Sequence, residues 1–179
     1  MFTLRTALRS ALIGALTGSP LAVAQDGPGL GIPASAEEVA AWDLTIAPDG
    51  IGLPPGSGDA RRGAEVYALQ CIACHGAEGS GQPSARLVGG HGSLAGDAPV
   101  KTIGSYWPYA TTVFDYIRRA MPLTQPQSLS NDDVYAVTAY LLHLNGIIDD
   151  DDVMNAETLP RIEMPNRNGF IVAYPTLRD

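Results

Sequence analysis

The sequence Cys71-Ile72-Ala73-Cys74-His75 decides the interpretation of the whole chain. Two cysteines separated by two residues, with a histidine directly after the second, are the attachment signature of a c-type haem. On a helical turn Cys71 and Cys74 fall on the same side, so both sulfurs can bond the two vinyl groups of one porphyrin. His75 then offers an imidazole nitrogen to the iron as its proximal ligand. The stretch predicts one covalently attached haem c, and therefore a carrier of electrons.

Three other uses of the two thiols compete with haem attachment: a reducible dithiol, a structural disulfide and half of a zinc site. A zinc site needs four ligands, and the chain has no other cysteine. A thioredoxin-like dithiol belongs in a βαβ frame, which the flanking sequence lacks. Haem attachment is therefore the interpretation that the sequence favours.

The length of 179 residues allows one domain of ordinary size with extensions. A hydrophobic content of 45% is normal for a globular core, whereas 20 glycines and 14 prolines indicate many loops. This balance suits a haem protein, because the cofactor itself fills the centre of a small core.

The N-terminus has the features of an export signal. Arg5 and Arg9 give it a positive start, and residues 11–24 are apolar but too short to span a bilayer. Ala22-Val23-Ala24 is a cleavage site, so we expect residues 1–24 to be a signal peptide. An uncleaved anchor is the alternative, although a proline and small residues make a poor spanning helix. Since haem is attached covalently outside the cytoplasm, both signals indicate the periplasm, with no membrane span after cleavage.

The chain is acidic. Without residues 1–24 it keeps 9 basic and 19 acidic side chains, a net charge of −10 before haem propionates are added. Such a domain should not bind nucleic acid or anionic lipid. It should favour partners with a basic docking patch, in a salt-sensitive way, although solubility alone explains the charge equally well.

The haem motif ends a predicted helix and begins a glycine-rich loop. The helix is expected from about residue 59 to 74, with Ser57 or Asp59 as its cap. The loop 76–94 can wrap one haem edge and hydrogen-bond the proximal imidazole. His91, within this loop, is expected at the surface rather than on the iron.

A second predicted helix leads to the candidate distal ligand. It runs from about residue 110 to 119, and Pro122 stops it. Met121 follows, about as far from His75 as a distal ligand would be. A thioether favours reduced iron and raises the potential relative to bis-histidine ligation. A core methionine is the alternative, but we favour Met121 as an iron ligand because Met154 and Met164 lie in the tail.

Tyr106 and Trp107 precede this helix and carry polar O–H and N–H groups. These groups are candidates for contacts with a haem propionate. Simple core packing of the two aromatic rings is the alternative.

A third helix is expected from residue 131 to about 145, between extended arms at both ends of the chain. The N-terminal arm has one short helix capped by Ser35 and is expected to lie on the haem domain with Trp42 as its anchor. The C-terminal tail is acidic, then irregular. Its apolar residues need burial against this domain or against a second subunit.

The order helix, Cys-x-x-Cys-His, loop, helix, Met-Pro, helix resembles a class I cytochrome c over about residues 57–146. In that family an N-terminal and a C-terminal helix cross near the haem, and Gly63, Tyr67 and Tyr140 match the residue types at that crossing. The resemblance implies an all-α fold, a cytochrome c-like single haem domain with extended N- and C-terminal arms. The expected divisions are a signal peptide at 1–24, an arm at 25–56, the haem domain at 57–147 and the tail at 148–179.

A narrower resemblance covers nearly the whole mature chain. It is to the cytochrome subunit (SoxD type) of sulfane dehydrogenase, the partner of a molybdenum subunit, and to the similar cytochromes of bacterial sulfite dehydrogenases. The matching stretches are Ala41-Trp42-Asp43 and residues 52–58, 104–112, 116–122 and 164–170. The resemblance implies haem attachment by Cys71 and Cys74, iron ligation by His75 and Met121, and arms packed against the molybdenum subunit.

Two features depart from the family pattern. Members of the SoxD type have two haem domains, whereas this chain has one attachment motif. Class I cytochromes also place a proline after the motif, and its carbonyl holds the proximal histidine. Pro83 is the only candidate here.

Taken together, the residues and the resemblance predict a periplasmic monohaem cytochrome c that is not catalytic alone. It is expected to accept electrons from a molybdenum sulfane or sulfite dehydrogenase and to deliver them to a downstream cytochrome c. One alternative is a free soluble electron shuttle between respiratory complexes. The other, from a different class, is a haem protein that binds small ligands.

Overall fold

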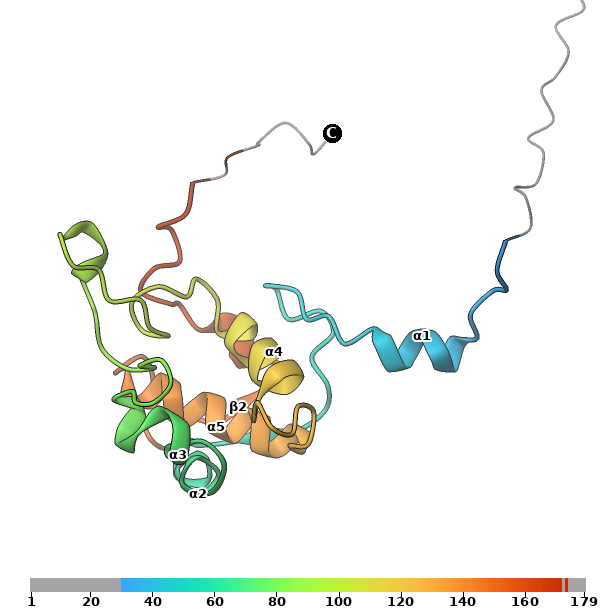
Figure 1. Ribbon diagram of the computed structural model, residues 1–179, viewed down its shortest axis with the longest axis horizontal. Coiled ribbons are helices and arrows are strands. Elements are labelled where there is room, and N and C mark those ends of the chain that lie inside the picture. The colour runs from blue at the N-terminus through green and yellow to red at the C-terminus, as the bar shows by residue number, and fades with distance from the viewer. Residues whose placement is uncertain (1–29, 172, 174–179) are drawn as a thin grey trace, which may run out of the picture. The chain divides into compact units, whose positions relative to one another are not determined.

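The computed structural model describes residues 30–171 and 173, so the expected signal peptide at residues 1–24 lies outside the described residues (Figure 1). The chain divides into two units, Met1–Val39 and Ala40–Asp179. Within the described residues, no helix is long and apolar enough to cross a membrane.

Helix α1 (Ala36–Trp42) runs across the boundary between the two units. Its start is a reciprocal capping box with Ser35 and Glu38. The Ser35 hydroxyl accepts a hydrogen bond from the Glu38 backbone N–H at 3.2 Å, and the Glu38 carboxylate accepts one from the Ser35 N–H at 2.8 Å. Local hydrogen bonds therefore close the first turn, which confirms the short helix expected in this arm.

Three helices form the centre of the second unit: α2 (Ala60–Gln70), α4 (Ala110–Ala120) and α5 (Asn131–Leu144). Helix α5 packs against both others, and Figure 1 shows it lying between them. The strands of the described residues, β1 (Ser57–Gly58) and β2 (Met154–Asn155), have two residues each. The all-α class expected from the sequence is confirmed.

Side-chain caps set the helix starts. The Asp59 carboxylate accepts a hydrogen bond from the Arg62 backbone N–H at 2.8 Å, so Asp59 rather than Ser57 caps α2. The Ser130 hydroxyl accepts one from the Asp133 N–H at 3.1 Å at the start of α5. The start of α5 is therefore where the sequence predicts it, and that of α2 lies one residue later.

The first helix differs from the prediction, which had it continue from residue 59 to 74. Helix α2 ends at Gln70, Cys71 has φ −122° and ψ −36°, and a separate short helix α3 (Ile72–His75) follows. The Cys71 carbonyl accepts hydrogen bonds from the N–H groups of Cys74 at 3.1 Å and His75 at 3.0 Å. The haem motif therefore forms a turn of its own rather than the end of a long helix.

Gly63 allows α2 and α5 to approach closely. A Cβ atom on Gly63 would lie 2.6 Å from the Cβ of Tyr140, and closer still to the carbonyl oxygen of Ala136. Because that side chain is absent, the helix backbones meet, and the rings of Tyr67 and Tyr140 pack with centroids 5.3 Å apart. The close crossing predicted at this glycine is confirmed.

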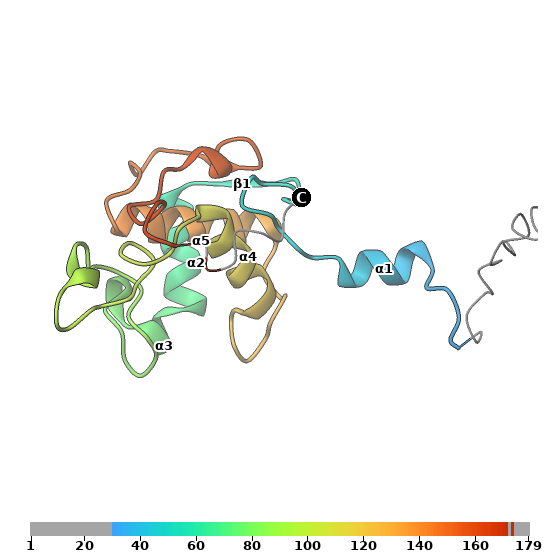
Figure 2. The same cartoon turned by 90° about the horizontal axis from the view of Figure 1, so that it is seen from above.

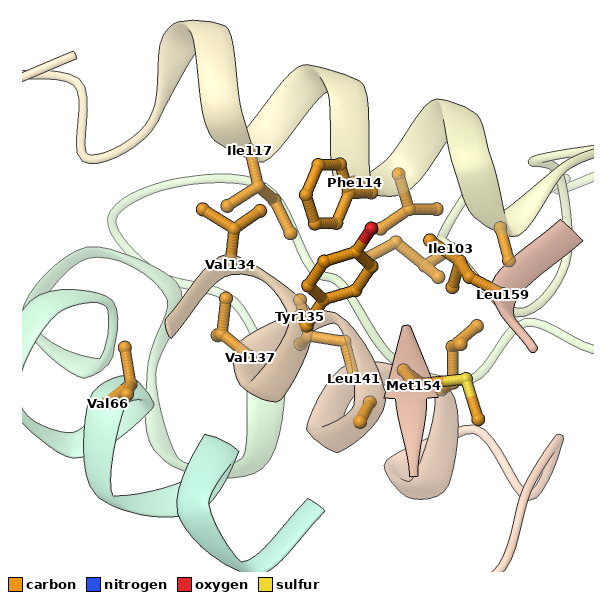
Figure 3. Packing of buried hydrophobic residues seen from close by; sticks show 14 of the residues in the cluster. Val66, Ile103, Phe114, Ile117, Val134, Tyr135, Val137, Leu141, Met154 and Leu159 are labelled. Carbon is orange, nitrogen blue, oxygen red and sulfur yellow. The ribbon is translucent and has the colours of Figure 1, made fainter. Parts of the chain in front are cut away.

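The interface between α4 and α5 is the apolar core of the unit. Phe114 of α4 and Tyr135 of α5 pack with their ring centroids 4.4 Å apart. Figure 3 shows the two rings side by side among aliphatic side chains that come from both helices and from neighbouring segments. This buried cluster holds the two helices in a fixed relation.

Parts of both expected arms belong to this core. Strands β1 and β2 pair antiparallel and so join the segment before α2 to the segment after α5. Apolar residues of both segments are buried in the same cluster as the helices: Ile46, Met154, Leu159 and Met164. The sequence left open whether the tail packs on this domain or on another subunit, and these tail residues pack on this domain.

Three polar side chains of α4 and α5 fix the segment before β1. They donate hydrogen bonds to successive proline-containing turns, whose carbonyls accept them. The pairs are Thr111 Oγ1 with Pro48 O at 3.1 Å, Tyr135 Oη with Pro54 O at 2.9 Å and Asn131 Nδ2 with Pro55 O at 3.2 Å.

The expected role of Trp42 as the anchor of the N-terminal arm is wrong. Its side chain is 87% exposed, whereas Ile46 is buried four residues later. The arm is anchored by Ile46 and by the proline carbonyls, because these lie where α4 and α5 offer apolar surface and hydrogen-bond donors.

Replacing Tyr135 by Phe should make the stability less sensitive to alkaline pH. Burial raises the pKa of Tyr135 to about 12, above the value of about 10 for an unfolded tyrosine. Between these two values the unfolded chain loses the phenolic proton and the folded chain keeps it. The wild type therefore loses up to about 3 kcal/mol of stability as the pH rises through this range.

The variant should be about 1 kcal/mol less stable than the wild type near neutral pH, because it lacks the hydrogen bond to Pro54. That difference should shrink or reverse above the pKa of an unfolded tyrosine. Urea unfolding of both proteins at neutral and at strongly alkaline pH measures it. A difference that stays constant with pH would show that Tyr135 ionises alike in both states.

Candidate haem-binding site

The α3 turn presents the two thiols differently. Cys71 is half-buried and packs on the hydrophobic core, whereas Cys74 is exposed. The backbone N–H of Ser84 donates a hydrogen bond to the Cys74 carbonyl at 2.8 Å, so the following loop folds back over the turn. One cysteine is therefore held by the core and the other by the loop.

The state of the thiols argues against two of the competing uses, a structural disulfide and a reducible dithiol. They are free and form no disulfide. Burial raises the pKa of Cys71 to about 11, with Cys74 adding to the shift. Reactive dithiols have the opposite property, a lowered pKa. Cys71 is therefore not poised for thiol–disulfide exchange.

The imidazole of His75 is oriented by a backbone carbonyl. Its Nδ1 lies 2.8 Å from the carbonyl oxygen of Ala85. Because a carbonyl can only accept, Nδ1 carries the proton and Nε2 keeps the lone pair that a metal requires. The loop thus orients the imidazole that is expected to be the proximal ligand, as the sequence predicts, but the carbonyl belongs to Ala85 and not to Pro83.

The loop that supplies this carbonyl is tied back to the turn. The Gly81 N–H donates to the His75 carbonyl at 2.7 Å, and the Tyr67 hydroxyl donates to the Gly76 carbonyl at 2.8 Å. Burial raises the pKa of Tyr67 to about 12, so this hydroxyl remains a donor at any ordinary pH. These hydrogen bonds fix the backbone carbonyls of His75 and of Gly76, the residue that follows it.

Met121 is the C-cap of α4. Its backbone N–H donates to the Ile117 carbonyl at 3.0 Å, and its φ of −121° and ψ of 146° take the chain out of the helix. The side chain is half-buried against the core. Figure 2 shows that α3 and the loop after α4 project from the same side of α5. The two expected iron ligands are therefore carried on one side of the domain.

The other methionines and histidines of the described residues are placed elsewhere. Met154 and Met164 are 2% and 1% exposed, inside the core. His91 is exposed on its loop, as expected, and the Nδ1 of His143 lies 3.3 Å from the Ile148 carbonyl that it faces. Burial of the tail methionines removes the competitors of Met121, which stays the predicted ligand.

Tyr106 and Trp107 have different surroundings. The Tyr106 ring meets Phe170 edge-on at 5.3 Å, and the Lys101 ammonium lies 5.1 Å from its centroid. Trp107 meets Tyr116 edge-on at 5.6 Å and packs on the core. The contacts of Trp107 match the core-packing alternative, and the propionate contact of either residue remains a prediction.

The donor set fits a haem c: two free thiols, an imidazole with Nε2 available and a thioether. When bound, the haem supplies a one-electron couple at its iron. Cys71 and Cys74 would attach that group and His75 and Met121 would bind its iron, with the imidazole oriented by the Ala85 carbonyl.

This fold and this donor set define a cytochrome c. A family model described as cytochrome c matches residues 60–145, which include α2, the haem motif, α4 and α5. The chain belongs to the cytochrome c family and is an electron carrier.

Two relatives place it more narrowly. A chain of the sulfane dehydrogenase SoxCD from Paracoccus pantotrophus is 46% identical, with a TM-score of 0.78; the match covers 84% of this chain and 75% of that chain. The thiosulfate dehydrogenase of Stutzerimonas stutzeri (strain A1501) is 33% identical over 112 residues, which is 56% of this chain and 35% of that protein. This chain therefore matches about a third of the thiosulfate dehydrogenase. The resemblance to the sulfane dehydrogenase family, predicted from the sequence, is confirmed.

Sequence reasoning missed two residues of the site. Ala85 acts through its carbonyl, which no side-chain pattern reveals. Asn145 is buried at the end of α5 and hydrogen-bonds the loop after the haem motif. An available signal was its position directly before Gly146, where an asparagine can close a helix with its own side chain.

Proposed function

We propose that this protein is a periplasmic monohaem electron-transfer subunit. It accepts electrons, one at a time, from a molybdenum-containing sulfane or sulfite dehydrogenase and passes them to a downstream cytochrome c. The observation that carries the proposal is the 46% identity to a chain of SoxCD over most of this chain. In this proposal Cys71 and Cys74 attach the haem, and His75 and Met121 bind its iron.

The organisation of the chain supports a subunit rather than a bare haem domain. We propose a haem domain at residues 57–147, with extensions at 25–56 and 148–179 after a cleaved signal peptide. Inner parts of both extensions pack on the domain through Ile46 and Met164. The outer parts are then available for a partner.

The apolar face of α1, a helix without buried residues, is the surface we propose for the dehydrogenase subunit. Val39 and Trp42 are three residues apart, so they lie on one helix face, and both are exposed. Leu30 and Ile32, which precede the helix, are exposed as well. Exposed aromatic anchors dominate binding at protein interfaces. The capping box at Ser35 favours the helix in the free protein, which lowers the ordering cost of binding.

Replacing Trp42 by Ala should weaken the complex by about 30-fold, the usual effect of truncating a buried tryptophan anchor. Haem content and the thermal unfolding midpoint should not change, because Trp42 is 87% exposed in the free protein. Ile51→Ala is the matched control, since it removes an exposed apolar side chain of the same arm outside α1. Titration of the dehydrogenase with each variant gives the affinities. Equal losses in the two variants would refute a specific role of α1.

The proposed function is tested on protein purified from its own periplasm without added salt. Molybdenum is measured in the haem-containing fraction, and sulfite or thiosulfate is then added while the haem absorption is recorded. Co-eluting molybdenum with substrate-dependent reduction supports the subunit and identifies the substrate. A red, molybdenum-free monomer that neither compound reduces refutes it in favour of the free shuttle, and colourless protein refutes haem attachment itself.

A further inference from the structure

We propose that Asn145 is a positioning residue for the haem iron. Through the loop of residues 85–89 it fixes the carbonyl that orients His75, and it thereby contributes to the reduction potential. The inference rests on the proposed assignment of His75 as an iron ligand and extends it to a residue 70 positions away in the sequence.

The side-chain amide of Asn145 joins the end of α5 to this loop at two points. The residue is 6% exposed. Its Nδ2 donates to the carbonyls of Leu141 at 2.8 Å and Leu87 at 3.3 Å, and its Oδ1 accepts from the Gly89 N–H at 3.0 Å. One planar amide is therefore bonded both to its own helix and to two residues of the loop.

The loop continues directly from these bonds to the imidazole. Ala85, whose carbonyl accepts the hydrogen bond from His75 Nδ1, lies two residues before Leu87. Ala85 and Arg86 are exposed, so burial does not hold them. The Leu87 N–H donates to the Gly79 carbonyl at 2.9 Å, and the Leu87 carbonyl also accepts from Ile103 at 3.2 Å. Ala85 therefore lies between two fixed points, Ser84 with its hydrogen bond to the Cys74 carbonyl and Leu87, and Asn145 acts on the second of these.

The fold leaves space for the side-chain amide of Asn145 next to Gly104. A Cβ atom on Gly104 would lie 2.6 Å from the Cγ of Asn145, so the absence of a side chain there makes the space. A second bond braces the same loop: the Thr102 hydroxyl donates to the Gly89 carbonyl at 2.5 Å. Thr102 is buried, and its hydroxyl also lies 3.2 Å from that of Ser105. Asn145 and Thr102 together restrain both backbone polar groups of Gly89: Asn145 accepts from its N–H, and Thr102 donates to its carbonyl.

The consequence for the iron follows from the bond between His75 and Ala85. A histidine that donates Nδ1–H to a well-placed carbonyl is a more basic ligand, which favours ferric iron and lowers the potential. If the loop loosens, the carbonyl moves, the bond weakens and the potential rises. Asn145 then influences the iron without touching the haem.

The test compares three variants of the full-length haem protein. Asn145→Ala removes the amide, and Thr102→Val removes the second brace with little change of shape. Tyr135→Phe is the control: it deletes a hydrogen bond of α5 on the side of Pro54, away from the loop. The readouts are the midpoint potential and the exchange rate of the His75 Nδ1 proton by NMR in the reduced state.

We expect Asn145→Ala to raise the potential and to accelerate exchange of that proton at least tenfold, with Thr102→Val shifting both in the same direction. Tyr135→Phe should change neither. Unchanged values in the first two variants, or an equal shift in the control, would overturn the inference. If Asn145→Ala does not fold, Thr102→Val against the control decides the question. Haem content of the wild type is measured in parallel, because its absence would refute the proposed site rather than the role of Asn145.

Discussion

Replacing Met121 by His should lower the reduction potential of the haem by on the order of 0.1–0.3 V, within the range of about 0.8 V that axial ligands span. A thioether stabilises ferrous iron, whereas a second imidazole stabilises ferric iron. Met121 is the half-buried cap of α4, so a histidine fits at this position without disturbing the buried helix face. Redox titration followed by the haem absorption gives the potential.

Met154→Leu is the matched control for this change. Met154 is buried in the core, and a swap of similar volume there should cost less than about 1.5 kcal/mol. Its effect on the potential should be negligible. If Met121→His leaves the potential unchanged, Met121 is not an iron ligand. Met121→Ala with unaltered spectrum and unaltered affinity for carbon monoxide would favour the small-ligand-binding alternative.

Replacing Gly63 by Val should cost more than about 3 kcal/mol of stability, a large part of the 5–15 kcal/mol typical of a domain. The new Cβ would lie 2.6 Å from the Cβ of Tyr140 and still closer to the backbone of Ala136. Neither contact is the end of a flexible side chain, so α2 and α5 must move apart. Denaturant unfolding of the haem protein measures the loss.

Ala68→Val on the same helix separates this effect from the lower helix propensity of valine. Ala68 is exposed, and the change should cost less than about 1 kcal/mol. Similar losses in the two variants would show that the contact between α2 and α5 is less important than its geometry indicates. A large loss confined to Gly63→Val would confirm it.

Local sequence predicted most of the helical framework. The caps Asp59 and Ser130 start α2 and α5 because a side-chain oxygen within three residues satisfies an otherwise unpaired backbone N–H. The family and the all-α class followed from the haem motif and from the order of helices around it. These features depend on neighbours within one helical turn, so the sequence carries them directly.

Other features depend on segments that are distant in the sequence. The helix break at Cys71 leaves the motif as a separate turn, where periodicity predicted a continuous helix. Trp42 is exposed although it is the largest apolar residue of its arm, because Ile46 and the proline carbonyls meet the available surface of α4 and α5. Hydropathy alone does not say which of two apolar residues finds a partner.

The sequence by itself determined that this chain has one haem c attachment motif with His75 as the expected iron ligand, because three residue types at fixed spacing are the chemical requirement. It also predicted that the main secondary-structure elements are helices. Only the tertiary structure decided that the carbonyl of Ala85, rather than that of Pro83, orients His75. The same holds for the hydrogen bonds of Asn145 to that loop, which join residues more than 50 positions apart. Contacts of this kind arise only when helix packing brings a loop and a helix end together.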